Sequence, residues 1–132
     1  MSGFSTYLSQ MTINSTLRGQ AFTIPAALYI ALFTSDPTDD NVTANEAAGA
    51  WYTRELTGSW SAPTGTGNET TNSNQIQWDA VTGAAITVSH WGIYDAATSG
   101  NLLYSGALGT AKTFGIGDVP VIAAGALSIE VD

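Results

Sequence analysis

The stretch from Ile86 to Leu108 constrains the fold more than any other part of the chain. Two strand-like runs in it flank a short turn at residues 95–100, which reads Asp-Ala-Ala-Thr-Ser-Gly. The runs are rich in β-branched and aromatic residues, whereas Asp, Ser and Gly are typical of turns. The pattern predicts a rigid β-hairpin. Nothing in it is arranged for catalysis, so it favours a structural or binding role.

Other segments predict further short strands. Residues 28–33 are apolar on both faces, which indicates a strand buried on both sides. Residues 51–57 alternate in polarity, and residues 112–114 with 119–122 are expected to form another hairpin. About seven or eight evenly spaced strands without a βαβ unit predict one all-β domain over residues 1–132. We expect an antiparallel β-sandwich, jelly-roll-like, with one N-terminal helix.

The N-terminal segment predicts an amphipathic helix at about residues 3–18. Ser2 is the expected N-cap and Gly19 the expected stop. Because Ser and Thr are poor helix formers, this helix needs a surface to pack against. It either covers an open end of its own sheet or docks on a neighbouring subunit or a larger assembly. The candidate residues for packing against another molecule are Phe4, Tyr7, Leu8, Met11 and Leu17.

Residues 58–74 are rich in Gly, Thr, Ser, Asn and Pro, which predicts a long surface loop. We expect it to face solvent and to tolerate an inserted tag near Gly65-Thr66-Gly67. Trp60 is its one large apolar residue and is the candidate exposed aromatic side chain, available for stacking on a glycan.

Residues that might carry chemistry are few and scattered. His90 lies beside Trp91 on a predicted strand, and a packed or hydrogen-bonded role is favoured over catalysis. Asp36, Asp39 and Asp40 form the densest acidic group; calcium binding is the alternative there to a solvated turn, which we favour. No pair of carboxylates is selected for glycoside hydrolysis. We expect no enzyme activity, no metal and no cofactor.

Charge and cysteine content exclude several classes of partner. The chain has a net charge of −8 and three basic residues, Arg18, Arg54 and Lys112. Nucleic-acid binding and attraction to an anionic membrane both need clustered cations, so we expect neither partner. Without cysteine, the fold depends on packing or on oligomerisation.

Four segments together carry a family resemblance. They are the hairpin stretch 86–108, residues 28–37 (LYIALFTSDP), residues 51–54 (WYTR) and residues 125–131 (GALSIEV). In this order and spacing the chain resembles a family of small tailed-bacteriophage virion proteins, labelled tail-fibre-like or decoration proteins. The resemblance implies a virion location and brings no catalytic residues with it.

The resemblance and the small size favour a capsid decoration, or cement, protein. Such a protein is expected to form a homotrimer and to stabilise the head by bridging subunits of the major capsid protein or other virion proteins. The candidate packing residues of the N-terminal helix would then contact a neighbouring subunit or the capsid. The alternative is a tail-fibre or tail-tip component that binds host-surface glycans.

Overall fold

A computed structural model describes residues 3–63 and 67–131, and it confirms an all-β fold with one N-terminal helix. The elements, in chain order, are β1 (Gly3–Phe4), α1 (Thr6–Leu17), β2 (Tyr29–Phe33), β3 (Glu55–Leu56), β4 (Glu69–Thr71), β5 (Ile76–Gln77), β6 (Ile86–Tyr94), β7 (Leu102–Phe114), β8 (Val121–Ile122) and β9 (Ser128–Glu130). In this part of the chain no helix has the length and hydropathy needed to cross a membrane.

The predicted central hairpin is confirmed as β6 and β7. These two strands lie inside a five-stranded antiparallel sheet with the order β1-β7-β6-β2-β3. At the turn, the carboxylate of Asp95 accepts hydrogen bonds from the backbone N–H of Asn101 (2.7 Å) and from its side-chain amide (3.0 Å). Ser99 and Gly100 both adopt positive φ angles, a conformation that glycine takes without strain.

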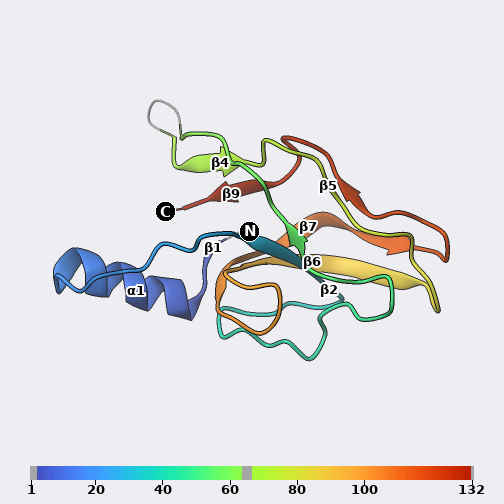
Figure 1. Cartoon of the computed structure of the whole chain (residues 1–132), viewed down its shortest axis with the longest axis horizontal. Coiled ribbons are helices and arrows are strands. Elements are labelled where there is room, and N and C mark those ends of the chain that lie inside the picture. Colours follow the sequence, from blue (N-terminus) through green and yellow to red (C-terminus); the bar gives the residue numbers. More distant parts are fainter. Residues whose placement is uncertain (1–2, 64–66, 132) are drawn as a thin grey trace.

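A second layer lies over one face of this sheet (Figure 1). It consists of two antiparallel ribbons, β4 with β9 and β5 with β8. The main core fills the space between the layers and combines Ile76 and Ile129 from the ribbons with Trp91 and Ile93 from β6. The two layers therefore bury one continuous apolar interior, as the sandwich prediction requires.

Strand β2 is buried on both faces, as predicted. Ile30 and Leu32 belong to the main core, while Ala31 and Phe33 join a smaller core on the opposite face. Leu102 and Tyr94 complete this second core, and the rings of Phe33 and Tyr94 stack 6.4 Å apart. The segment between β2 and β3 crosses this face and covers it (Figure 1).

The predicted surface loop at residues 58–74 is partly wrong, because it contains β4. Trp60 and Asn72 also form an isolated antiparallel bridge. Asn72 is only 1% exposed. Its amide donates to the carbonyls of Asn74 (2.8 Å) and Ala123 (3.0 Å) and accepts from the N–H of Leu127 (2.9 Å). A polar composition therefore concealed a buried structural residue. Gly65 and Thr66 of the expected tag site lie outside the described residues.

Two further strand predictions differ from the structure. Lys112-Thr113-Phe114 pairs with the start of β6 rather than with residues 119–122, and β8 pairs with β5. The central hairpin is thus longer than predicted, because β7 includes residues 112–114, which the sequence assigned to a second hairpin. Of residues 51–57, only Glu55 and Leu56 form a strand.

Arg54 and Glu46 form a half-buried ion pair next to β3. Arg54 donates from Nε to Oε2 and from Nη2 to Oε1 of Glu46, both at 2.9 Å, and Tyr52 donates its hydroxyl to the same Oε2 at 2.7 Å. Such two-point contacts fix direction as well as charge. Burial alone would raise the pKa of Glu46, but the hydrogen bonds from Arg54 and Tyr52 outweigh it and lower that pKa.

The same guanidinium holds the central hairpin. Nη1 of Arg54 donates to the backbone carbonyls of Ala96 (3.2 Å) and Ser99 (2.7 Å), which belong to the hairpin turn. Its Cζ lies 3.7 Å from the centroid of the Tyr94 ring, a cation–π contact. Burial raises the pKa of Tyr94 to about 12, although the nearby Arg54 opposes the shift. Arg54 thus joins the turn, the second core and the segment after β2.

We predict that Glu46 makes the fold sensitive to acid. Its folded-state pKa lies below the ordinary value of 4.5, so its contribution to stability is complete above about pH 4.5 and is lost as pH falls through the lowered pKa. Urea unfolding of the wild type from pH 7 to pH 3 should show this loss, and Glu46→Gln should show a smaller acid-dependent part. Glu55→Gln, outside the ion pair, is the control. An identical pH dependence in Glu46→Gln and wild type would contradict the prediction.

We also predict that Gly92 has no room for a side chain. A Cβ at this position would lie 2.9 Å from Leu102 and 3.2 Å from both Phe33 and Tyr94. Gly92→Ala should therefore destabilise the fold by about 1–3 kcal/mol, the usual cost of overpacking. Gly109→Ala, in the partner strand β7 with nothing within 4 Å, is the matched control and should cost much less in urea titrations.

Candidate functional site

The N-terminal helix is anchored to the body at its base. The hydroxyl of Ser5 accepts from the N–H of Leu8 (3.0 Å) and donates to the carbonyl of Leu102, so Ser5 is the N-cap. Gly3 and Phe4, predicted to be helical, instead form β1 and pair with β7. Ser2, the expected N-cap, lies outside the described residues.

Beyond its first turn the helix projects away from the sheet. Figure 1 shows α1 extending from the body and the following chain returning alongside it toward β2. We call residues 9–27 the N-terminal arm. Gly19, with φ +66°, follows the C-cap residue Arg18, which confirms the predicted stop. The main contacts of α1 with other elements are with β1 and β7, at its base.

The candidate packing residues do not lie on one face of the helix, as the amphipathic prediction required. Leu8 is its one buried residue, whereas Leu17 is 80% exposed. They are nine residues apart, about two and a half turns, and therefore lie on opposite sides of α1. Ile13, 52% exposed, shares the outer side with Leu17, and Ile24 on the returning segment is 81% exposed. The outer side of the arm is thus apolar and open to solvent.

The remaining candidate packing residues are less exposed than Leu17. Phe4 lies on β1, and its ring meets that of Tyr104 edge to face with centroids 5.5 Å apart. Tyr7 and Met11 are half-buried on α1. Of the candidates for contact with another molecule, Leu17 is therefore the one that its own subunit leaves exposed.

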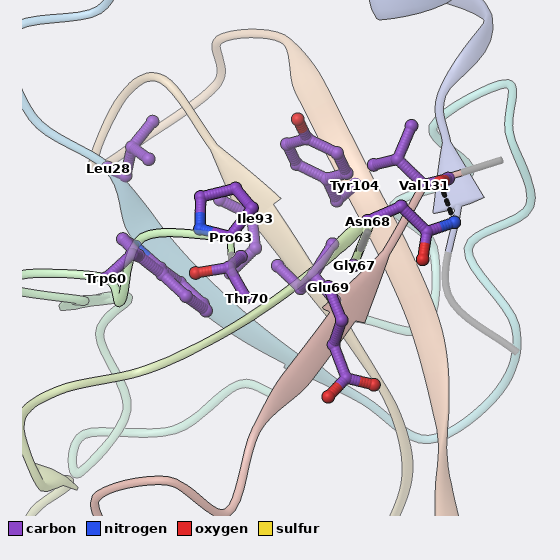
Figure 2. A pocket seen from close by; sticks show the side chains of 11 residues that line it. Leu28, Trp60, Pro63, Gly67, Asn68, Glu69, Thr70, Ile93, Tyr104 and Val131 are labelled. Carbon is purple, nitrogen blue, oxygen red and sulfur yellow. Dashed lines mark hydrogen bonds between the residues drawn. The ribbon is translucent and has the colours of Figure 1, made fainter. Parts of the chain in front are cut away.

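An apolar pocket of about 430 Å³ opens between the two layers of the sandwich. Figure 2 shows its lining side chains, which come from both layers and from the segment before β4. Ile93, fully buried in the main core, is one of them, so the pocket reaches the interior. Its volume is in the range of sites that hold small ligands. The lining residues are Leu28, Trp60, Pro63, Gly67, Asn68, Glu69, Thr70, Ile93, Tyr104, Ile129 and Val131.

Several polar groups of this pocket already have partners. The amide of Asn68 donates to the carbonyl of Val131 (Figure 2), and the hydroxyl of Thr70 donates to the carbonyl of Ser61 at 2.5 Å. Burial raises the pKa of the Tyr104 hydroxyl. Glu69 is exposed and carries its carboxylate away from the apolar side chains (Figure 2). The pocket therefore offers apolar surface with a negative charge at its edge.

Trp60, expected to be exposed, is half-buried. It packs against the main core, and its indole N–H donates to the hydroxyl of Thr57 at 3.1 Å. It stands in the pocket wall beside Pro63 (Figure 2). The difference follows from β4, because pairing of this segment with β9 brings it onto the core.

His90 and the acidic group lie elsewhere. His90 is on β6, as predicted, and its Nδ1 is hydrogen-bonded to the hydroxyl of Ser89 at 2.7 Å. It lines a cavity of about 420 Å³ together with Asp36 and Asp39. Among residues 3–63 and 67–131, no three His, Cys, Asp or Glu side chains are grouped as metal ligands would be.

The acidic segment serves the local backbone and the base of the helix. Asp36 accepts from the N–H of Thr38 at 2.8 Å, a turn around Pro37. Asp40 accepts from the hydroxyl of Thr6 at 2.8 Å, and the carbonyl of Asp39 accepts from the N–H of Thr6 at 2.9 Å. Its contacts are those of the favoured structural turn.

Sequence reasoning missed the pocket and the outer side of the arm. Ile13 and Ile24 gave a signal in the sequence, since they are large apolar residues that belong to none of the predicted packing groups. The pocket had no such signal, because its walls come from segments that are far apart in the sequence.

We predict that Ser5→Ala destabilises the helix and its attachment together. It removes the N-cap and the hydrogen bond to Leu102, so a loss of about 1–2 kcal/mol is expected. Ser15→Ala is the control, because the Ser15 hydroxyl contacts only the helix carbonyl of Thr12. Circular dichroism with urea titration measures both. Equal stability of the two variants would mean that α1 is not held at its base.

Comparison with known proteins agrees with the four-segment resemblance. The family described as Podophage GP4 fiber I protein gp80 matches residues 3–130. No curated protein matches the chain. The family match covers the sandwich, the central hairpin and the arm. The chain therefore belongs to the family of the Podophage GP4 fiber I protein gp80, which is a family of tailed-phage virion proteins.

Proposed function

We propose that this chain is a structural, non-enzymatic subunit of a tailed-phage fibre. The observation that carries the proposal is the family match over residues 3–130, whose description names a fibre protein. The sequence favoured a cement protein of the capsid, with a fibre or tail-tip component as the alternative. The small, sparsely charged chain suits both, and the description of the matched family supports the fibre.

The shape of the subunit supports a role in assembly. Large aliphatic side chains stand exposed on the arm, and an apolar pocket opens at the sandwich. Exposed apolar surface of this kind marks sites where a protein meets another molecule. The amide of Asn68 and the hydroxyl of Thr70 donate to backbone carbonyls of the subunit itself, and most other lining side chains are apolar. The pocket therefore favours an apolar protein partner over a glycan.

A homo-oligomeric subunit, with a trimer as the first choice, is part of this proposal. Fibres repeat one chain about an axis, and most soluble oligomers are symmetric assemblies of identical chains. Other virion proteins of the tail are the expected further partners. We assign no enzyme activity to the subunit.

Labelling of intact particles tests the fibre assignment. Fab fragments raised against the purified protein should bind phage particles at the tail in electron micrographs, because a fibre subunit is exposed there. Fab fragments against an unrelated protein are the control. Label spread evenly over the head would contradict the fibre and support the cement protein.

A further inference from the structure

We propose that the N-terminal arm of one copy docks in the apolar pocket of a neighbouring copy. Leu17 and Ile24 enter the pocket, and Arg18 lies near Glu69 at its edge. This inference rests on the proposed function, because it names the contact that joins identical subunits of the fibre.

The arm and the pocket are both apolar, and within one subunit the arm is exposed and the pocket is open. Leu17 and Ile24 are 80% and 81% exposed, so the subunit provides no apolar cover for them. The pocket has about 430 Å³ of open space between apolar side chains, including Ile93 and Ile129 of the core. Aliphatic side chains fit this lining, and burying both surfaces removes apolar area from water.

Charge supports a second copy as the occupant. Arg18 is one of three basic residues in a chain of net charge −8, and it adjoins Leu17 on the arm. Its Nη1 donates to Asn14 at 3.0 Å, which holds the guanidinium on the exposed side of the helix. Glu69 lines the pocket with its carboxylate directed outward (Figure 2). Docking of the arm therefore places the guanidinium of Arg18 near the carboxylate of Glu69.

The symmetry of the contact agrees with a ring. The arm and the pocket are different surfaces of the same chain, so the interface is heterologous. Repetition of such a contact closes into a ring when the rotation allows it and otherwise gives a filament. A ring of three copies would place three arms and three pockets in one closed set.

Cross-linking tests the contact directly, because the chain has no cysteine of its own. The double variant Leu17→Cys/Val131→Cys should form covalent oligomers under mild oxidation, visible on non-reducing gels and lost on reduction. A disulfide needs Cβ atoms about 3.5–4.5 Å apart, so random encounters give little product. The control is Leu17→Cys with Thr110→Cys, an exposed site on β7 outside the pocket. Equal cross-linking in both pairs would overturn the inference.

Substitutions test the energy of the contact. Light scattering of the wild type should show an oligomer at about 100 µM, where a contact with micromolar Kd is saturated. Leu17→Asp should raise the dissociation constant at least about tenfold, and Thr16→Asp, which adds the same charge on the exposed neighbouring residue, should raise it less. Arg18→Glu should weaken association, and Arg18→Glu/Glu69→Arg should restore part of it.

The outcomes separate this inference from the fibre assignment. A wild type that stays monomeric, or a Leu17→Asp variant that associates as the wild type does, overturns the docking of the arm. Either result leaves the fibre assignment standing if Fab fragments still bind at the tail. Label on the head together with specific cross-linking would keep the contact and remove the fibre. If oligosaccharides bind the protein and the Leu17→Cys/Val131→Cys pair gives no more cross-linking than its control, a glycan and not the arm occupies the pocket.

Discussion

One charged side chain, Arg54, supports two features of the fold. These are the burial of β2 on both faces and the position of the central hairpin turn. The second core lies on the face of the sheet that the ribbons do not cover, and only irregular chain is available to close it. Arg54 stabilises that irregular chain because its guanidinium meets Glu46, the Tyr94 ring and two carbonyls of the hairpin turn. A buried ion pair is a weak source of stability by itself. Here the ion pair positions the chain, since it fixes where the hairpin turn and the segment after β2 lie.

The parts of the fold that sequence predicted are those in which local pattern and tertiary structure agree. The hairpin turn at residues 95–100, the double-sided apolar run before Phe33 and the glycine stop at Gly19 each follow from residue types at a fixed spacing. The helix prediction was wrong at its start. Phe4 fits a helical spacing, but it pairs with Tyr104 across the sheet. Periodicity cannot show that pairing, since the partner lies on a distant strand.

Composition misled where polar residues are structural. The Gly, Thr, Ser and Asn of residues 58–74 predicted a solvent-exposed loop, yet Asn72 is buried and its side chain bonds to the distant backbone groups of Ala123 and Leu127. Trp60 packs against the main core because its segment pairs with neighbouring strands instead of extending into solvent. The candidate pocket could not be predicted at all, because it exists only when the segment before β4 is laid across the ends of β6, β7 and β9.

A chain with few charges has few ways to specify how its copies meet. Salt bridges across an interface need complementary ions, and this chain carries three basic residues, of which Arg54 is committed to its own fold. Shape and apolar surface must then supply most of the specificity between copies, with Arg18 the available charge on the arm. An arm with an apolar outer side and a pocket that opens onto the core meet that requirement. The contact that we propose between copies uses the side of the helix on which Leu17 is left exposed by its own subunit.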